Sequence, residues 1–201
     1  MTDFSRREAL GIMAAVPVAQ VLDLTPPVLE RAMRAAEDAV AGRDAGGAPF
    51  TPKFFTAHEW RSVRMLADYI IPRDERSGSA TDAGVPEFMD FIMIDRPTEQ
   101  TWMRGGLAWL DIRCGALYGK RFIECTLAQR SEMLDAIAYP RKAKPDASQG
   151  VEFFNRLRDL TASGFYTSKM GIKDLQYMGN MMLTEWKGCP DAALKKLGVS
   201  Y

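Results

Sequence analysis

Apolar residues recur every three or four positions along most of this chain, a spacing that places them on one face of an α-helix. In the clearest stretch five of them share such a face: Trp60, Val63, Leu66, Ala67 and Ile70. A capping-box sequence from Thr56 to Glu59 precedes this stretch, and Pro72 ends it because proline disfavours a helical conformation in the residue before it. The chain is therefore expected to fold mainly into helices.

Further segments show the same periodicity, and most of them carry their own start or stop signal. Helices are expected to begin at Thr25-Pro26, at Pro86 and at Thr126. Two more are expected to cover residues 103–117 and 151–160, the second of them with a stop at Gly164, and a last short helix is expected at residues 190–198. The Gly105-Gly106 pair predicts a close contact between two helices. No segment shows sustained two-residue alternation, so strands are not expected. The sequence predicts an all-α protein, a compact irregular helical bundle of roughly five to seven helices.

The chain of 201 residues is close to the size of one large domain, and its composition divides it into three parts. Residues 1–22 are interpreted as a leader segment, and residues 23–50 hold a helix and a flexible connector that begins at Gly42. Residues 51–201 form the main helical domain, in which residues 141–149 are expected to be a solvated loop.

The leader combines two adjacent arginines with a short apolar stretch. Arg6 and Arg7 follow Ser5, and residues 11–19 are apolar but too few to span a bilayer. This arrangement is similar to the twin-arginine export signal, which carries folded proteins across a membrane, and it predicts a periplasmic location. The alternative is an amphipathic N-terminal helix that stays on the protein, because Ala9 replaces the usual bulky residue and no clean cleavage site follows.

The charge balance and the small supply of metal-binding side chains exclude several classes of function. The 26 basic and 26 acidic residues cancel, so the chain has no general electrostatic attraction for nucleic acid or for an anionic membrane. One histidine and three cysteines without a C-x-x-C pair provide no haem attachment motif and no self-sufficient metal site. Neither G-x-G-x-x-G nor a P-loop sequence occurs. No catalytic, cofactor-binding or metal-binding residue is therefore expected in this chain.

His58 is the single residue on which an enzyme hypothesis could rest. A small lone enzyme would use it together with a carboxylate such as Glu59 or Asp68. Because His58 lies within the capping box on the first turn of an amphipathic helix, we expect instead a surface or packing histidine. No G-x-S-x-G nucleophile elbow accompanies it.

The most unusual stretch, residues 164–189, combines glycines and polar turn residues with a high density of aromatic and methionine side chains. Tyr and Trp provide a large contact area with one polar group, and Met repacks easily, so these residue types are favoured where proteins meet. The stretch is a candidate partner interface, to which six residues are expected to contribute: Phe165, Tyr166, Tyr177, Met178, Met181 and Trp186. An irregular but buried cap on the bundle is the alternative interpretation.

Five short sequences give the chain a family likeness. In order along the chain they are Tyr69-Ile70-Ile71-Pro72, Gly84 to Asp90, Glu152 to Thr161, Gly164 to Ser168, and Gly188-Cys189-Pro190. In their order and spacing, across residues 5–199, the chain resembles the gluconate 2-dehydrogenase subunit 3 family. That family comprises the small subunits of flavin-dependent, membrane-linked sugar dehydrogenases.

The resemblance implies a non-catalytic accessory subunit. Such a subunit binds a large flavoprotein of the glucose-methanol-choline oxidoreductase type, which holds FAD and oxidises a sugar or sugar acid. The small subunit helps the large one to mature and carries it through the export channel, and a cytochrome c subunit often receives the electrons. No cofactor and no membrane span are implied for this chain. An export chaperone that releases its client after folding is the alternative.

Three cysteines, Cys114, Cys125 and Cys189, allow at most one internal disulfide. An oxidising compartment such as the periplasm would favour that bond. Their positions in the sequence do not select the pair, so the pairing remains open.

Overall fold

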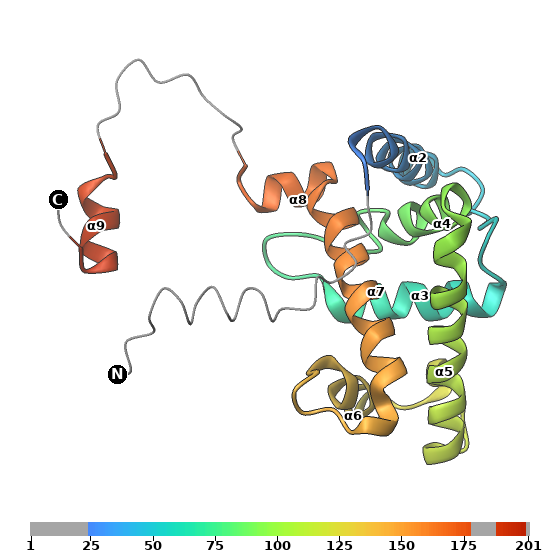
Figure 1. The fold of residues 1–201 in the computed structure, drawn as a ribbon. Coiled ribbons are helices and arrows are strands. Elements are labelled where there is room, and N and C mark those ends of the chain that lie inside the picture. Colours follow the sequence, from blue (N-terminus) through green and yellow to red (C-terminus); the bar gives the residue numbers. More distant parts are fainter. Residues whose placement is uncertain (1–23, 178–187, 200–201) are drawn as a thin grey trace.

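The computed structural model describes residues 24–177 and 188–199, and within these ranges the chain is helical, without a β-strand (Figure 1). These ranges contain eight α-helices: α2 (Pro26–Asp44), α3 (Ala57–Ile70), α4 (Val85–Asp95), α5 (Gln100–Tyr118), α6 (Leu127–Ala138), α7 (Ser148–Tyr166), α8 (Lys169–Asp174) and α9 (Asp191–Leu197). Three short 3-10 turns lie between them: η1 (Pro97–Glu99), η2 (Phe122–Glu124) and η3 (Pro145–Ala147). The expected all-α fold is confirmed, and α8 is the helix that the periodicity did not predict.

Helix α7 is the central element of the fold (Figure 1). It packs against α3, α4, α5, α6 and α8, and its inner face supplies a row of buried side chains: Phe153, Phe154, Leu157, Leu160 and Phe165. Each of these side chains contributes on the order of 1.5–3 kcal/mol through its removal from water. Helix α2 packs on α4 and buries Ala32 and Ala36 in the same core, so it is continuous with the main helical body.

Helices approach α7 most closely where an aromatic ring lies over a glycine. Three such pairs occur along α7: Phe153 over Gly106 of α5, Trp109 of α5 over Gly150, and Phe88 of α4 over Gly164. A Cβ atom on Gly106 would stand 1.9 Å from the Phe153 ring, whereas nothing lies within 4 Å of the same position on Gly105. The close contact predicted for the Gly105-Gly106 pair is therefore made by Gly106 alone.

The helix starts expected from capping sequences are confirmed. Thr56 Oγ1 accepts a hydrogen bond from the Glu59 N–H at 3.3 Å, and the Glu59 carboxylate accepts one from the Thr56 N–H at 2.8 Å. Thr126 and Gln129 form the same reciprocal pair at the start of α6. Both pairs satisfy backbone donors that would otherwise lack a partner in the first turn of each helix.

Three expected boundaries are wrong. Helix α7 continues beyond Gly164, because this glycine makes room for the Phe88 ring and does not reverse the chain. Helix α2 runs to Asp44, past the connector expected to begin at Gly42. The loop expected at residues 141–149 contains η3 and the first residues of α7.

Within the described part of the chain, no helix is both long enough and apolar enough to cross a membrane. The leader residues Ser5, Arg6 and Arg7 lie outside the described residues.

The substitution Gly106→Ala should lower the free energy of unfolding by about 1–3 kcal/mol, because the added Cβ would overlap the Phe153 ring. Gly105→Ala is the matched control on the same helix. It faces open space and should raise the free energy of unfolding by about 0.5–1 kcal/mol, since alanine has the higher helix propensity. Urea unfolding followed by circular dichroism measures both values. Equal stability of the two variants would contradict the close packing of α5 on α7.

Candidate functional site

A sharp corner joins the end of the central helix α7 to the short helix α8. We call residues 165–177 the α7–α8 corner. Ser168 caps α8, and its hydroxyl accepts a hydrogen bond from the Gly171 N–H at 3.1 Å. A Cβ atom on Gly171 would stand 2.1 Å from the Phe165 carbonyl oxygen, so only glycine allows the first turn of α8 to lie this close to the end of α7.

Exposed apolar side chains are concentrated at the α7–α8 corner. Tyr166, Ile172, Leu175 and Tyr177 are 41%, 38%, 56% and 66% exposed, respectively. They are four of the eleven large hydrophobic residues that the described part of the chain exposes. Ile172 and Leu175 are three positions apart in a helical stretch and so share one face. A local concentration of apolar side chains at the surface is typical of a site where another protein binds.

The structure divides the residues that the sequence assigned to an interface. Tyr166 and Tyr177 lie on this surface, as expected. Phe165 is only 1% exposed, so it belongs to the core and is not available to a partner. Its inward position follows from the continuation of α7 past Gly164, which keeps the helical periodicity to the end of the helix. The other three assigned residues lie outside the described residues: Met178, Met181 and Trp186.

Ile172 and Leu175 were not among the residues expected at an interface. Their signal was present in the three-residue spacing that follows a capping serine, Ser168. The glycine at position 171 concealed it, because a glycine in such a short segment indicates a turn more often than a helix. Here the glycine is required by the close approach to α7.

The loop between α3 and α4, residues 71–84, fixes the position of α8. Arg76 Nη2 donates to the backbone oxygen of Asp174 at 2.5 Å and forms an ion pair with its carboxylate at 3.2 Å. A Cβ atom on Gly78 would stand 3.0 Å from the Met170 sulfur, so the loop also packs directly on α8. The α3–α4 loop thus contacts the α7–α8 corner and holds α8 in place.

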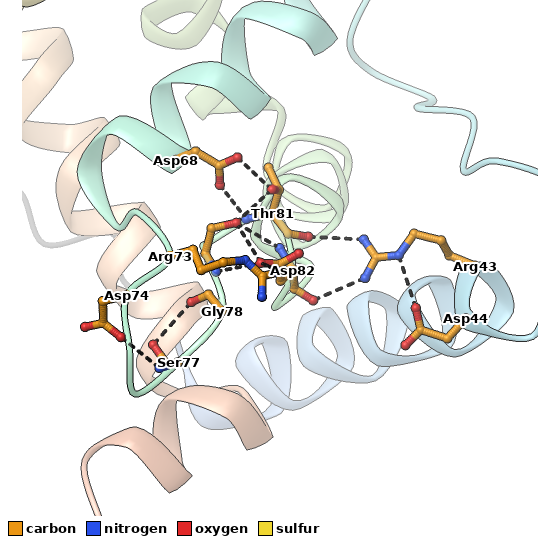
Figure 2. Close-up of polar contacts among 10 residues, drawn as sticks. Arg43, Asp44, Asp68, Arg73, Asp74, Ser77, Gly78, Thr81 and Asp82 are labelled. Atoms are coloured by element: carbon orange, nitrogen blue, oxygen red, sulfur yellow. Dashed lines mark hydrogen bonds and ion pairs between the residues drawn. The ribbon is translucent and has the colours of Figure 1, made fainter.

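Polar contacts connect the α3–α4 loop to its neighbours, and Figure 2 shows several of them. The Asp68 carboxylate at the end of α3 accepts hydrogen bonds from Thr81 N and Thr81 Oγ1 at 2.9 and 2.7 Å. Asp82 Oδ2 accepts from Ser79 N at 2.7 Å and from Ser79 Oγ at 3.0 Å. From α2, Arg43 donates to the backbone oxygens of Thr81 and Asp82 at 3.2 and 3.3 Å. Hydrogen bonds and ion pairs of this loop therefore reach α2, α3 and α8.

Two loop carboxyl groups have pKa values below the ordinary value for aspartate. Burial alone would raise the pKa of Asp82, but hydrogen bonds from Ser79 and the positive charges of Arg73 and Arg43 outweigh it, and the pKa is lowered. The backbone N–H groups of Ser77 and Arg76 are the main cause of the lowered pKa of Asp74. Both carboxylates are consequently ionised at neutral pH and act as hydrogen-bond acceptors that shape the loop.

His58 pairs with a carboxylate that the sequence did not indicate. Its Nε2 lies 2.5 Å from Asp111 Oδ2 on α5, and Asp111 Oδ1 accepts a hydrogen bond from the Phe122 N–H at 3.0 Å. Glu59 is engaged in its capping box and Asp68 holds Thr81, so His58 pairs with neither of the two carboxylates that the enzyme hypothesis named as examples. The His58–Asp111 pair connects α3 to α5 and to η2.

No cluster of three or more His, Cys, Asp or Glu side chains within residues 24–177 and 188–199 could hold a metal ion. The α7–α8 corner offers apolar contact area on a backbone that the adjoining loop holds in place. Such a surface is suited to binding a protein without the free-energy cost of large rearrangements.

The comparison with protein families gave one result. A family model described as gluconate 2-dehydrogenase subunit 3 matches residues 57–185, well over half of the chain. The match includes α3 through α8, and with them the α3–α4 loop and the α7–α8 corner. No curated protein and no solved structure matches the chain.

The substitution Asp82→Asn should lower the free energy of unfolding by about 1–2 kcal/mol near neutral pH, because a carboxamide loses the ion pair with Arg73 and weakens the bonds from Ser79. The folded-state pKa of Asp82 lies below its unfolded value, so its stabilising contribution is complete above the ordinary Asp pKa. The contribution is lost as the pH falls through the lowered value.

Urea midpoints of wild type and variant, measured over a series of pH values, should therefore differ at neutral pH and converge in acid. The control is Asp159→Asn, whose carboxylate is exposed and 3.9 Å from Arg158, and which should change stability by less than about 0.5 kcal/mol. A difference between wild type and Asp82→Asn that persists unchanged in acid would contradict this role of the carboxylate.

Proposed function

Because this chain belongs to the gluconate 2-dehydrogenase subunit 3 family, we propose that it is the non-catalytic small subunit that binds and matures a large FAD-dependent dehydrogenase subunit. A subunit of this family is part of a multi-subunit dehydrogenase complex. The proposed partner is of the glucose-methanol-choline oxidoreductase type and oxidises a sugar or a sugar acid. A cytochrome c subunit that accepts the electrons is proposed as a third component.

The observation that carries the proposal is the exposed apolar surface of the α7–α8 corner. Tyr177 and Leu175 expose more than half of their side chains to solvent, although the core of the protein is well formed beneath them. A stable partner would remove this apolar area from water, which at about 25 cal/mol per Å² favours association. Obligate interfaces bury on the order of 2,000 Å² or more, so the corner would be one part of a larger contact surface.

The contacts that hold the corner support a lasting association. A surface that is already ordered loses little conformational entropy when it binds, and the Arg76–Asp174 contact and the Ser168 cap supply that order. We therefore place the small subunit in the mature complex in equal proportion to the large one. An export chaperone that releases its client would be absent from the purified complex, so its stoichiometry separates the two functions.

In this proposal FAD belongs to the large subunit, and this chain contributes no ligand to it. The role of this chain in maturation would be to cover an apolar surface that the large subunit exposes when it is alone. Cofactor loading then follows from the folding of the large subunit, because a binding partner stabilises the folded state by mass action.

We propose further that the leader exports both subunits together into the periplasm. The twin-arginine route carries folded proteins, so one leader with Arg6 and Arg7 can serve two chains that are already bound to each other. This arrangement requires an interface that survives transit, which an apolar obligate contact provides.

The double substitution Leu175→Ala and Tyr177→Ala should weaken binding of the large flavoprotein subunit by about tenfold or more, because it removes two exposed apolar side chains from the centre of the proposed contact. The large subunit is taken from the complex that the wild-type chain forms in its native cells. Titration of that subunit with each small-subunit variant gives the dissociation constants.

The matched control is Ile112→Ala with Leu117→Ala, two exposed apolar residues of α5 that are 73% and 54% exposed. This pair should leave the dissociation constant unchanged within about twofold. Equal weakening by the two double substitutions would remove the α7–α8 corner as the binding surface. If the large subunit copurifies with none of the small-subunit proteins, the wild type included, the proposed function itself is wrong.

Replacement of both Arg6 and Arg7 by lysine should leave the small subunit and its flavoprotein partner in the cytoplasm, since the export route distinguishes arginine from lysine at equal charge. Cell fractionation with antibodies against both subunits measures the distribution. Arg34→Lys, an exposed position on α2, is the control and should be exported normally. Periplasmic accumulation of the Arg6→Lys, Arg7→Lys protein would show that the export proposal is wrong.

A further inference from the structure

Two buried thiols lie side by side where α5 connects to α6. Cys114 is on α5 and is fully buried, and Cys125 follows η2 and is 4% exposed. The Cys114 thiol is hydrogen-bonded to the Cys125 sulfur, and the Cys125 thiol donates to the Arg121 carbonyl oxygen at 3.4 Å. The two sulfurs thus belong to one short hydrogen-bonded chain in the interior.

The fold brings these two cysteines together through η2, which turns the connection back onto α5. Phe122 of η2 is 1% exposed, and its N–H donates to Asp111, which lies three residues before Cys114 and so on the same side of α5. The capping box of Thr126 then starts α6 directly after Cys125. Cys125 therefore lies between η2, which packs on α5, and the start of α6.

In the reduced protein the Cys114 thiol is weakly reactive. Burial is the main cause that raises the pKa of the Cys114 thiol to about 12, and the neighbouring Cys125 and Asp111 contribute to the same rise. A thiol with such a pKa is almost fully protonated at neutral pH and is a poor nucleophile. The Cys114 thiol would therefore pass through a reducing cytoplasm unmodified.

We propose that Cys114 and Cys125 close into an intramolecular disulfide bond once the protein reaches an oxidising compartment. This inference rests on the proposed export for its compartment, whereas the choice of the pair rests on the contact between the two thiols. Neighbouring sulfurs have only a short distance to travel before they reach the roughly 2.05 Å of an S–S bond. Cys189 lies on the exposed turn before α9 and has no part in this bond.

The oxidation is a thiol–disulfide exchange with the disulfide of a periplasmic thiol oxidase. Cys125, the less buried of the two, attacks that disulfide first and forms a mixed disulfide, and one oxidase sulfur leaves as a thiol. Cys114 then displaces the second oxidase sulfur. Two S–H bonds of this chain are broken and one S–S bond forms, while the two electrons and two protons reduce the oxidase disulfide to a dithiol.

The bond would join the last turns of α5 to the start of α6 and close a short loop through η2. A disulfide across a short loop stabilises a protein chiefly by restricting the unfolded chain. The bonded form should therefore melt at a higher temperature than the reduced form, by roughly 5–10 °C for a chain of this size.

The experiment equilibrates the purified full-length chain in glutathione buffers of increasing oxidation, alkylates the remaining thiols after denaturation, and maps the peptides by mass spectrometry. The expected result is a peptide pair joined through Cys114 and Cys125, a protein lighter by two hydrogens, and the higher melting temperature. Cys189→Ala should keep all three results, and Cys114→Ser or Cys125→Ser should abolish them.

Two outcomes would overturn the inference. One is complete alkylation of both thiols after equilibration in the most oxidising buffer, including with mild urea present to allow local opening. The other is a bond that joins either residue to Cys189. The wild-type measurement decides the matter even when a serine variant fails to fold. The glutathione experiment uses purified protein and involves no export, so a failure to form the disulfide would leave the export proposal untouched. Conversely, a chain that forms the disulfide in vitro but stays in the cytoplasm of living cells would refute the export proposal alone.

Discussion

Aromatic rings that lie over glycines determine how closely α4 and α5 approach α7, and the core of the bundle is built around that approach. The Phe153 ring occupies the space that a side chain on Gly106 would fill, and the Phe88 ring does the same at Gly164. Protein interiors tolerate little change in volume, so these contacts fix α4 and α5 against the central helix within narrow limits. The end of α7 is thereby placed at the surface in one orientation.

The exposed apolar surface of the α7–α8 corner follows from that placement. Where α7 ends, Gly171 allows the chain to turn within contact distance of the Phe165 backbone, and α8 begins at once. The α3–α4 loop then holds α8 through Arg76 and Asp174, with Asp68 and Asp82 keeping the loop in shape (Figure 2). The apolar side chains at the corner are exposed because the residues beneath them are already fully packed. In our proposal the large dehydrogenase subunit covers this exposed apolar area.

The sequence was informative wherever the signal was local and uninformative where two distant segments meet. The capping boxes at Thr56 and Thr126 and the helical periodicity identified most of the helices correctly, because both depend on residues within one turn. Gly164 was misread as a stop because a glycine that admits a ring and a glycine that ends a helix look the same in a sequence. The aromatic and methionine content of residues 164–189 assigned Phe165 to an interface, although it lies in the core. The pairing of His58 with Asp111 joins residues 53 positions apart, and no spacing rule predicts such a contact.

The central claim is that the α7–α8 corner is covered in the assembled dehydrogenase complex, and hydrogen–deuterium exchange tests it most directly. Amide exchange is measured on the small subunit alone and in complex with the large flavoprotein subunit. The account predicts slower exchange in the complex for peptides that cover residues 166–177, while exchange in the exposed first half of α2 stays the same. Unchanged exchange at residues 166–177 in a complex that is fully assembled would contradict it.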